Sequence, residues 1–115
     1  MKIIGLGTDI VEVERIKTFA EKPGALARIF SETEIAYCLA RKNKYEHLAV
    51  RFAAKEAVYK ALPFGGVAFK DMEVVNDAGG APNVLIHDAR CAGLHILISL
   101  SHTAHYAVAT AVVQQ

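Results

Sequence analysis

The sequence predicts an α+β domain in which helices pack on one face of a mainly antiparallel sheet. Three observations lead to this class. A β-branched segment opens the chain at residues 2–11, helical periodicity continues as far as Leu62, and after Pro63 the apolar residues take up the pattern of short strands. With 115 residues and 53% hydrophobic content, the chain suits one folded domain, 1–115.

Residues 2–11 are rich in Ile, Val and Gly, which favours a strand, and we expect it to end near Asp9. Apolar positions at helical spacing predict a helix at 12–20, and Pro23-Gly24 stops it. The first part of the chain is therefore expected to be a strand followed by a short helix.

A capping box predicts the start of the next helix. Ser31 is the expected N-cap, and Glu34 stands three residues later, as the reciprocal hydrogen bonds of this motif require. The helix is expected to place Ile35, Cys38 and Leu39 on one face.

The rest of the chain reads as one long helix and several strands. Helical periodicity runs from Glu46 to Leu62 and stops at Pro63. The segments that follow are a hairpin with arms at 72–75 and 83–87 around a turn at 77–80, a short helix or turn at 88–93, and strands at 94–100 and 106–113 joined by a polar loop at 101–105.

Composition and charge exclude several classes of function. A formal net charge of +1 provides no basic field typical of nucleic-acid binding. Cys38 and Cys91 form no disulfide or zinc pattern, so we interpret them as buried, inert thiols of a reducing compartment. The start of the chain has no signal-peptide pattern, and no segment has the roughly 18 uninterrupted apolar residues of a membrane span. We expect a cytoplasmic protein with no membrane and no nucleic-acid partner.

The first candidate for chemistry is Asp9, which follows Gly5 and Gly7. Glycines would let a ligand approach the backbone beside this carboxylate. An aspartate at a strand end is also a common turn or helix cap, so Asp9 alone leaves both interpretations open.

The second candidate lies in the long helix, where Glu56 and Lys60 are four residues apart and share one face. Such a pair can simply be a solvated ion pair worth a few tenths of a kcal/mol. Arg51 and Lys55 add two cations, and we predict that all three gather with the carboxylate at an anionic ligand. Magnesium binds one or two protein carboxylates together with phosphate oxygens and water. Asp9 would supply the second carboxylate if its strand packs beside this helix.

The third candidate is the loop with Ser101, His102 and Thr103, whose side chains suit phosphate oxygens or ordinary turn chemistry. His102 and His105 are also a conceivable metal pair, although no third soft ligand stands nearby. The chain has no P-loop, no Gly-x-Ser-x-Gly elbow and no Cys-x-x-Cys motif.

Four blocks together resemble the holo-acyl-carrier-protein synthase family of 4′-phosphopantetheinyl transferases, in the order of that family and over nearly the whole chain. They are IGLGTDIVEVERI at 4–16, FSETE at 30–34, RFAAKEAVYKAL at 51–62 and ISLSHT at 98–103. The resemblance implies the phosphopantetheinyl transferase fold. It further implies that Asp9 and Glu56 bind Mg²⁺, that Lys60 lies near the pyrophosphate, and that the loop at 101–103 contacts coenzyme A.

Two departures from the family pattern are informative. Larger monomeric relatives carry a third acid two residues after the first, and here Val11 occupies that position. This departure points to the short type, a homotrimer with active sites between subunits. The stretch 63–67 is also shorter than the usual glycine-rich loop, which puts the affinity for coenzyme A in doubt.

The reaction implied is attack of a carrier-protein serine on the β-phosphorus of coenzyme A, with loss of adenosine 3′,5′-bisphosphate. Glu56, or a water on the magnesium that it orients, would take the serine proton. Carrier proteins are acidic, so Arg15 and Lys17, and with them Lys22 and Arg28, are expected to form the docking surface. A simply solvated helix face is the alternative.

Two rival functions use the same residues. A binding module would hold coenzyme A or another nucleotide without turnover, and a magnesium-dependent hydrolase would release phosphopantetheine to water. Weighing an apo carrier protein after incubation with the protein, coenzyme A and magnesium separates all three, because only the transferase increases its mass.

Overall fold

The computed structural model describes all residues 1–115. It contains three α-helices, five strands and three short 3₁₀ turns. In chain order these are β1 (Ile3–Glu12), α1 (Val13–Ala20), η1 (Leu26–Arg28), α2 (Glu32–Leu39), α3 (Lys44–Ala61), η2 (Phe69–Asp71), β2 (Met72–Asn76), β3 (Pro82–Ile86), η3 (Ala89–Cys91), β4 (His95–His102) and β5 (Tyr106–Gln114).

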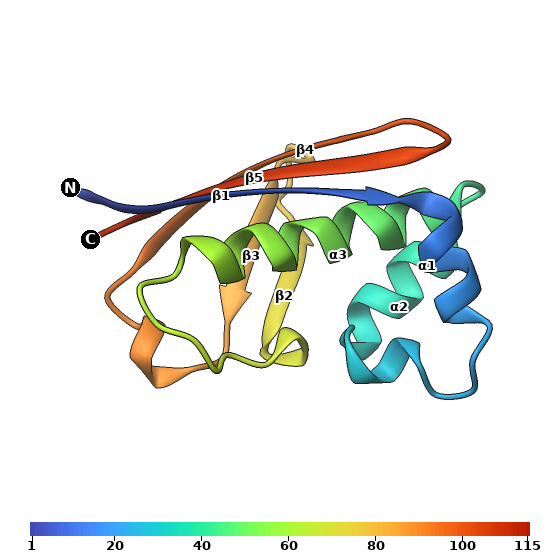
Figure 1. Ribbon diagram of the computed structural model, residues 1–115, viewed down its shortest axis with the longest axis horizontal. Coiled ribbons are helices and arrows are strands. Elements are labelled where there is room, and N and C mark those ends of the chain that lie inside the picture. Colours follow the sequence, from blue (N-terminus) through green and yellow to red (C-terminus); the bar gives the residue numbers. More distant parts are fainter.

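The strands form two antiparallel sheets, one with the order β1-β5-β4 and one consisting of the β2-β3 hairpin. Helix α3 runs along one face of the larger sheet, and α1 and α2 pack near the N-terminal end of α3 (Figure 1). The predicted α+β class with helices on one face of an antiparallel sheet is confirmed. None of the helices is long and apolar enough to cross a membrane.

Helix α3 lies so close to β1 that only glycine fits between them. A Cβ atom on Gly5 would lie 1.7 Å from the carbonyl oxygen of Ala61, and one on Gly7 would lie 1.9 Å from that of Ala57. The expectation that these glycines admit a ligand is therefore wrong. They admit the backbone of α3, and this contact sets the distance between Asp9 and the helix.

The capping box is confirmed, because the Ser31 hydroxyl accepts from the Glu34 N–H and the Glu34 carboxylate accepts from the Ser31 N–H. The predicted apolar face of this helix is wrong at one position: Leu39 is 47% exposed, whereas Glu34 is buried beside Cys38. Both cysteines are free and buried, as expected.

Three boundaries differ from the prediction. Strand β1 does not end near Asp9 but continues to Glu12, because β5 supplies hydrogen-bonding partners along its whole length. Helix α3 begins at Lys44, two residues earlier than expected. His102 is the last residue of β4, so the loop between β4 and β5 is shorter than predicted.

Candidate functional site

Asp9, Glu56 and Lys60 meet where β1 crosses α3. Asp9 follows Gly7 by two residues, so both face the helix. The Lys60 ammonium donates to the Thr8 carbonyl oxygen at 3.0 Å and lies 3.3 Å from Asp9 Oδ1. Burial, followed by the negative charge of Asp9, raises the pKa of Glu56. The structure therefore brings together the two carboxylates and the lysine that the sequence singled out.

The donor set of this site fits a magnesium ion. Burial and the charge of Asp9 disfavour the ionised form of Glu56, and a divalent cation bound between the two carboxylates offsets both effects. No group of three or more His, Cys, Asp and Glu side chains is arranged to hold a metal. Two carboxylates leave most coordination positions of an ion free, and Mg²⁺ prefers to fill such positions with substrate phosphate oxygens and water. A closed structural zinc site instead needs four protein ligands.

Lys55 does not belong to this site, and its predicted role in binding the anionic ligand is wrong. The residue is only 1% exposed, and its side chain points to a different face of α3, about 100° around the helix from Glu56. There its ammonium contacts Glu34 Oε1 at 2.6 Å and donates to the carbonyl oxygens of Ile29 and Phe69. All three donors are satisfied, so the residue joins α2 and both neighbouring 3₁₀ segments to α3.

Arg51 is also separated from Glu56, so the three predicted cations do not gather around one carboxylate. Five residues on an α-helix correspond to a rotation of about 140° around its axis. Arg51 is buried, with its guanidinium 4.3 Å from the centre of the Tyr37 ring, and Arg41 lies 3.8 Å from the same ring. Arg51 Nε has no hydrogen-bond partner, which is unusual for a buried charged group.

Arg51 lines a cavity of about 320 Å³ between α3, β4 and the β2-β3 hairpin. His102 and His47 also line it, with their rings 5.4 Å apart, and His102 Nδ1 lies 2.8 Å from Glu46 Oε1. Burial and then the positive charge of neighbouring groups lower the pKa of His47. Sequence reasoning missed His47 and Tyr37, because no local motif marks residues that meet only through the tertiary fold.

The other residues of the predicted loop behave differently. Ser101 is exposed on β4 and does not line the cavity. The Thr103 hydroxyl accepts from the N–H groups of His105 and Tyr106, so it shapes the turn between β4 and β5. The turn interpretation therefore applies to Thr103, and of these loop residues the structure brings His102 to the cavity.

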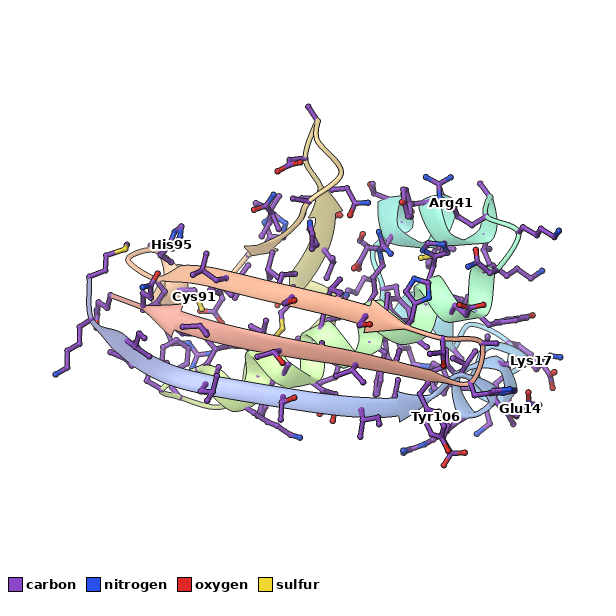
Figure 2. All side chains as sticks on the ribbon, turned by 90° about the horizontal axis from the view of Figure 1, so that it is seen from above. Glu14, Lys17, Arg41, Cys91, His95 and Tyr106 are labelled. Carbon is purple, nitrogen blue, oxygen red and sulfur yellow. The ribbon has the colours of Figure 1, made fainter.

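The basic residues of α1 are exposed at one end of the larger sheet. Lys17 lies there beside Glu14 and near Tyr106 (Figure 2), and its ammonium is 5.9 Å from the centre of the Tyr45 ring. Arg15 is near enough to Glu56 to lower the pKa of that carboxyl, opposing the effect of burial. The predicted docking surface thus adjoins the carboxylates.

The outer face of the larger sheet is uncovered and carries both polar and large apolar side chains (Figure 2). Leu6 and Ile10 on β1 are 69% and 65% exposed. The exposed side chains of Leu97, Tyr106 and Val108 continue this face across β4 and β5. The polar row of Thr8, Thr110 and Ser99 crosses the face between these groups, and the large exposed apolar side chains on either side of it are suited to a protein contact.

Comparison with known proteins places these features in a family. Residues 5–111 match the family model described as the 4′-phosphopantetheinyl transferase superfamily. The holo-[acyl-carrier-protein] synthase of Protochlamydia amoebophila (strain UWE25) is 48% identical over 117 residues, covering 95% of this chain and 96% of that protein.

Two crystal structures share the fold. A holo-(acyl-carrier-protein) synthase from Bacillus anthracis str. Ames, in complex with CoA (3′,5′-ADP), has a TM-score of 0.86 at 36% identity and covers 98% of this chain and 97% of its own. Holo-[acyl-carrier-protein] synthase of Helicobacter pylori, in complex with coenzyme A, has a TM-score of 0.84 at 32% identity, with coverage of 95% and 99%.

Proposed function

This chain belongs to the 4′-phosphopantetheinyl transferase superfamily as a holo-[acyl-carrier-protein] synthase, and we propose that its carboxylate site and its Arg51 cavity divide the work of that reaction. The enzyme transfers 4′-phosphopantetheine from coenzyme A to a serine of apo acyl carrier protein and releases adenosine 3′,5′-bisphosphate. The observation that carries the proposal is the meeting of Asp9, Glu56 and Lys60 from distant parts of the chain.

Asp9 and Glu56 are the residues that would hold Mg²⁺. When bound, this ion neutralises negative charge on the pyrophosphate of coenzyme A. The chain contributes the position of the two carboxylates, which the close packing of Gly7 against Ala57 fixes to the helix. The raised pKa of Glu56 supports this role, because burial and a neighbouring negative charge are the conditions that a divalent cation relieves.

Glu56 is our candidate to accept the proton of the serine hydroxyl. The alternative is a water on the magnesium that Glu56 orients, and in both cases the proton acceptor lies beside the pyrophosphate. Lys60 is our candidate to stabilise the charge that develops on the phosphate oxygens. Its ammonium is half-exposed and is held by Thr8 and Asp9, so a side-chain rotation is enough to bring it to a substrate.

The Arg51 cavity is our candidate for the anionic end of coenzyme A. The unpartnered Nε of Arg51 supports a phosphate or a water bound there, since a buried guanidinium rarely lacks a partner. His102 and His47 add imidazole N–H donors to the same cavity. Lys55 contributes nothing to this binding because Glu34 occupies it.

The two parts of this site face apart on one chain, and this supports an active site completed by a second subunit. Because Arg51 and Glu56 lie about 140° apart around α3, one compact ligand does not easily reach both from one subunit. The exposed apolar side chains on the outer face of the sheet provide a surface for association. Val11, at the position of the third acid in larger relatives, is buried in the core. We therefore propose a homotrimer in which the Arg51 cavity of one subunit faces Asp9 and Glu56 of the next.

The carrier protein would dock on α1, where Arg15 and Lys17 are exposed beside the carboxylates. Acidic residues of a carrier protein complement such a surface and increase the rate of encounter. Lys22 and Arg28 are exposed as well and would extend this surface.

Mass spectrometry of the carrier protein tests the proposed function. Apo carrier protein incubated with the enzyme, coenzyme A and Mg²⁺ is expected to gain the mass of phosphopantetheine. Asp9→Ala and Glu56→Ala should abolish this gain while circular dichroism shows a retained fold. Near wild-type turnover of either variant at saturating magnesium would remove the metal site from the proposal.

Mixing two inactive variants tests the shared site. Arg51→Met damages the cavity and Glu56→Gln damages the carboxylates, so each variant alone should be inactive. Co-expressed in equal amounts, they should recover up to about a quarter of wild-type activity, because a quarter of random interfaces then join two intact halves. A mixture no more active than the separate variants, or a fully active monomer by light scattering, would contradict the homotrimer.

A further inference from the structure

The loop 63–68 follows the end of α3 at Ala61 and its C-cap Leu62, and it carries two adjacent glycines. The backbone N–H groups of Phe64 and Gly65 donate to no group of the chain, and Gly65 is exposed. Free backbone donors in a glycine-bearing loop suit phosphate oxygens, since at Gly65 no side chain keeps the ligand away. The loop therefore holds two unused donors of the kind that phosphate oxygens accept from.

This loop is fastened at two points. On the helix side, the Gly66 N–H donates to the Tyr59 hydroxyl at 3.1 Å, and Gly66 adopts a φ of +80°, which favours glycine. On the other side, Arg90 Nη1 donates to the Gly65 carbonyl oxygen at 3.0 Å. The Arg90 guanidinium also lies 4.6 Å from the centre of the Phe64 ring.

Arg90 is itself held in one orientation by Asp88. Its Nε donates to Asp88 Oδ1 at 3.1 Å and its Nη2 to Oδ2 at 2.8 Å, a two-pronged geometry that only arginine provides. The hydrogen bonds from Arg90 lower the pKa of Asp88, so the carboxylate stays ionised. Asp88 also accepts from the backbone N–H of Arg90, which ties the pair to η3.

We propose that Arg90 is a positioning residue for coenzyme A: together with Asp88 it holds the short loop after α3 in the conformation that presents its free N–H groups to the diphosphate. This inference rests on the proposed function. Pre-ordering the loop removes an entropic cost from binding, which would compensate for the few residues that the loop offers. Arg90 would thus act on substrate affinity and leave the chemical step to Asp9, Glu56 and Lys60.

Arg90→Met tests the inference, since it keeps an apolar side chain over Phe64 and removes the guanidinium group that bonds to Asp88 and Gly65. The dissociation constant for coenzyme A, measured by titration calorimetry with Mg²⁺, should rise about fivefold to tenfold. The rate of transfer at saturating coenzyme A should stay within about twofold. Amide hydrogen exchange at Gly66 should become faster in the ligand-free variant, which reports directly on the loop.

Two further variants make the result specific. Arg90→Lys keeps the charge but cannot pair with Asp88 through two prongs, so it should recover only part of the affinity. Lys70→Met is the matched control: Lys70 is exposed and lies two residues after the loop, and its side chain takes part in no hydrogen bond or ion pair of the structure. We expect wild-type affinity and wild-type Gly66 exchange for this control.

An unchanged dissociation constant for coenzyme A in Arg90→Met would overturn the inference. Full recovery of affinity in Arg90→Lys, or an equal loss of affinity in Lys70→Met, would overturn it as well. A parallel fall in the saturated transfer rate would also refute a role limited to substrate positioning. Failure of the wild-type enzyme to bind coenzyme A would instead refute the proposed function itself and the inference with it. The wild-type measurement therefore distinguishes the two.

Discussion

Gly7→Ala is the substitution for which the structure gives the sharpest expectation. The new Cβ would lie 1.9 Å from the Ala57 carbonyl oxygen, whereas ordinary contacts of a Cβ begin near 3.4 Å. Strand β1 and helix α3 must therefore separate by about 1.5 Å, the difference between these two distances. Overpacking of a well-packed core costs about 1–3 kcal/mol, and we expect the upper end because the obstacle is backbone on both sides.

The same displacement should reduce the transfer rate even of the variant molecules that are fully folded. Asp9 lies two residues along the strand on the same face, so it moves away from Glu56 and Lys60 together with Gly7. A misplacement of about 1 Å in a reacting geometry can cost about 100-fold in rate. Transfer should fall by this order at temperatures where the variant is fully folded.

Urea denaturation gives the free energy of unfolding, and mass spectrometry of the carrier protein gives the transfer rate. Gly93→Ala is the control, because nothing lies within 4 Å of its Cβ position and its φ is not left-handed. This control should be neutral or slightly stabilising. If Gly7→Ala kept both wild-type stability and wild-type transfer, the glycines would not set the distance between β1 and the helix.

Three other predictions address different parts of the molecule. Lys55→Met leaves Glu34 buried without its cation and should lower the free energy of unfolding by about 3–5 kcal/mol in urea titrations. Adding Glu34→Gln should recover part of this loss. A loss below about 1 kcal/mol in Lys55→Met would contradict a buried ion pair. His47 has a lowered pKa, so its imidazole stays neutral in the folded protein at pH values where the unfolded chain takes up a proton, and stability is lost as pH falls below 6.5. The Tm of wild type should therefore drop more steeply between about pH 7 and 5.5 than the Tm of His47→Gln. Parallel curves for the two proteins would count against this role of His47. Reversing Arg15 and Lys17 to Glu should raise the Michaelis constant for the carrier protein and leave that for coenzyme A unchanged, with a smaller gap at high salt; an effect on coenzyme A alone would move the docking surface elsewhere.

The sequence was sufficient for the parts of the fold that local rules control. The capping box at Ser31 and the hairpin around 77–80 depend on residues close in the chain, and both are present. The position of Asp9 was harder, because the length of β1 depends on β5 at the other end of the sequence. Nothing local shows that a strand continues past a polar residue when a distant partner is available.

The separation of the α3 cations follows from their spacing in the sequence. Arg51 and Lys55 are four residues apart and share one face, while Glu56 and Lys60 share another about 100° away from Lys55. Helical geometry alone therefore argues against one cluster of three cations. What the sequence could not show is that Glu34, 21 residues before Lys55, would be buried beside it.

Helix α3 must be fixed in two ways for the carboxylate site to form, and different residues provide each. The glycines of β1 set how close the helix lies, because any Cβ there would push it away. The buried pair of Lys55 and Glu34 sets its rotation, since a turn of the helix would strand the ammonium without its three acceptors. Glu56 directly follows Lys55, so the rotation that satisfies the buried lysine also aims the carboxylate at Asp9. The buried ion pair, which touches no reacting group, is therefore a condition for the geometry on which the proposed chemistry depends.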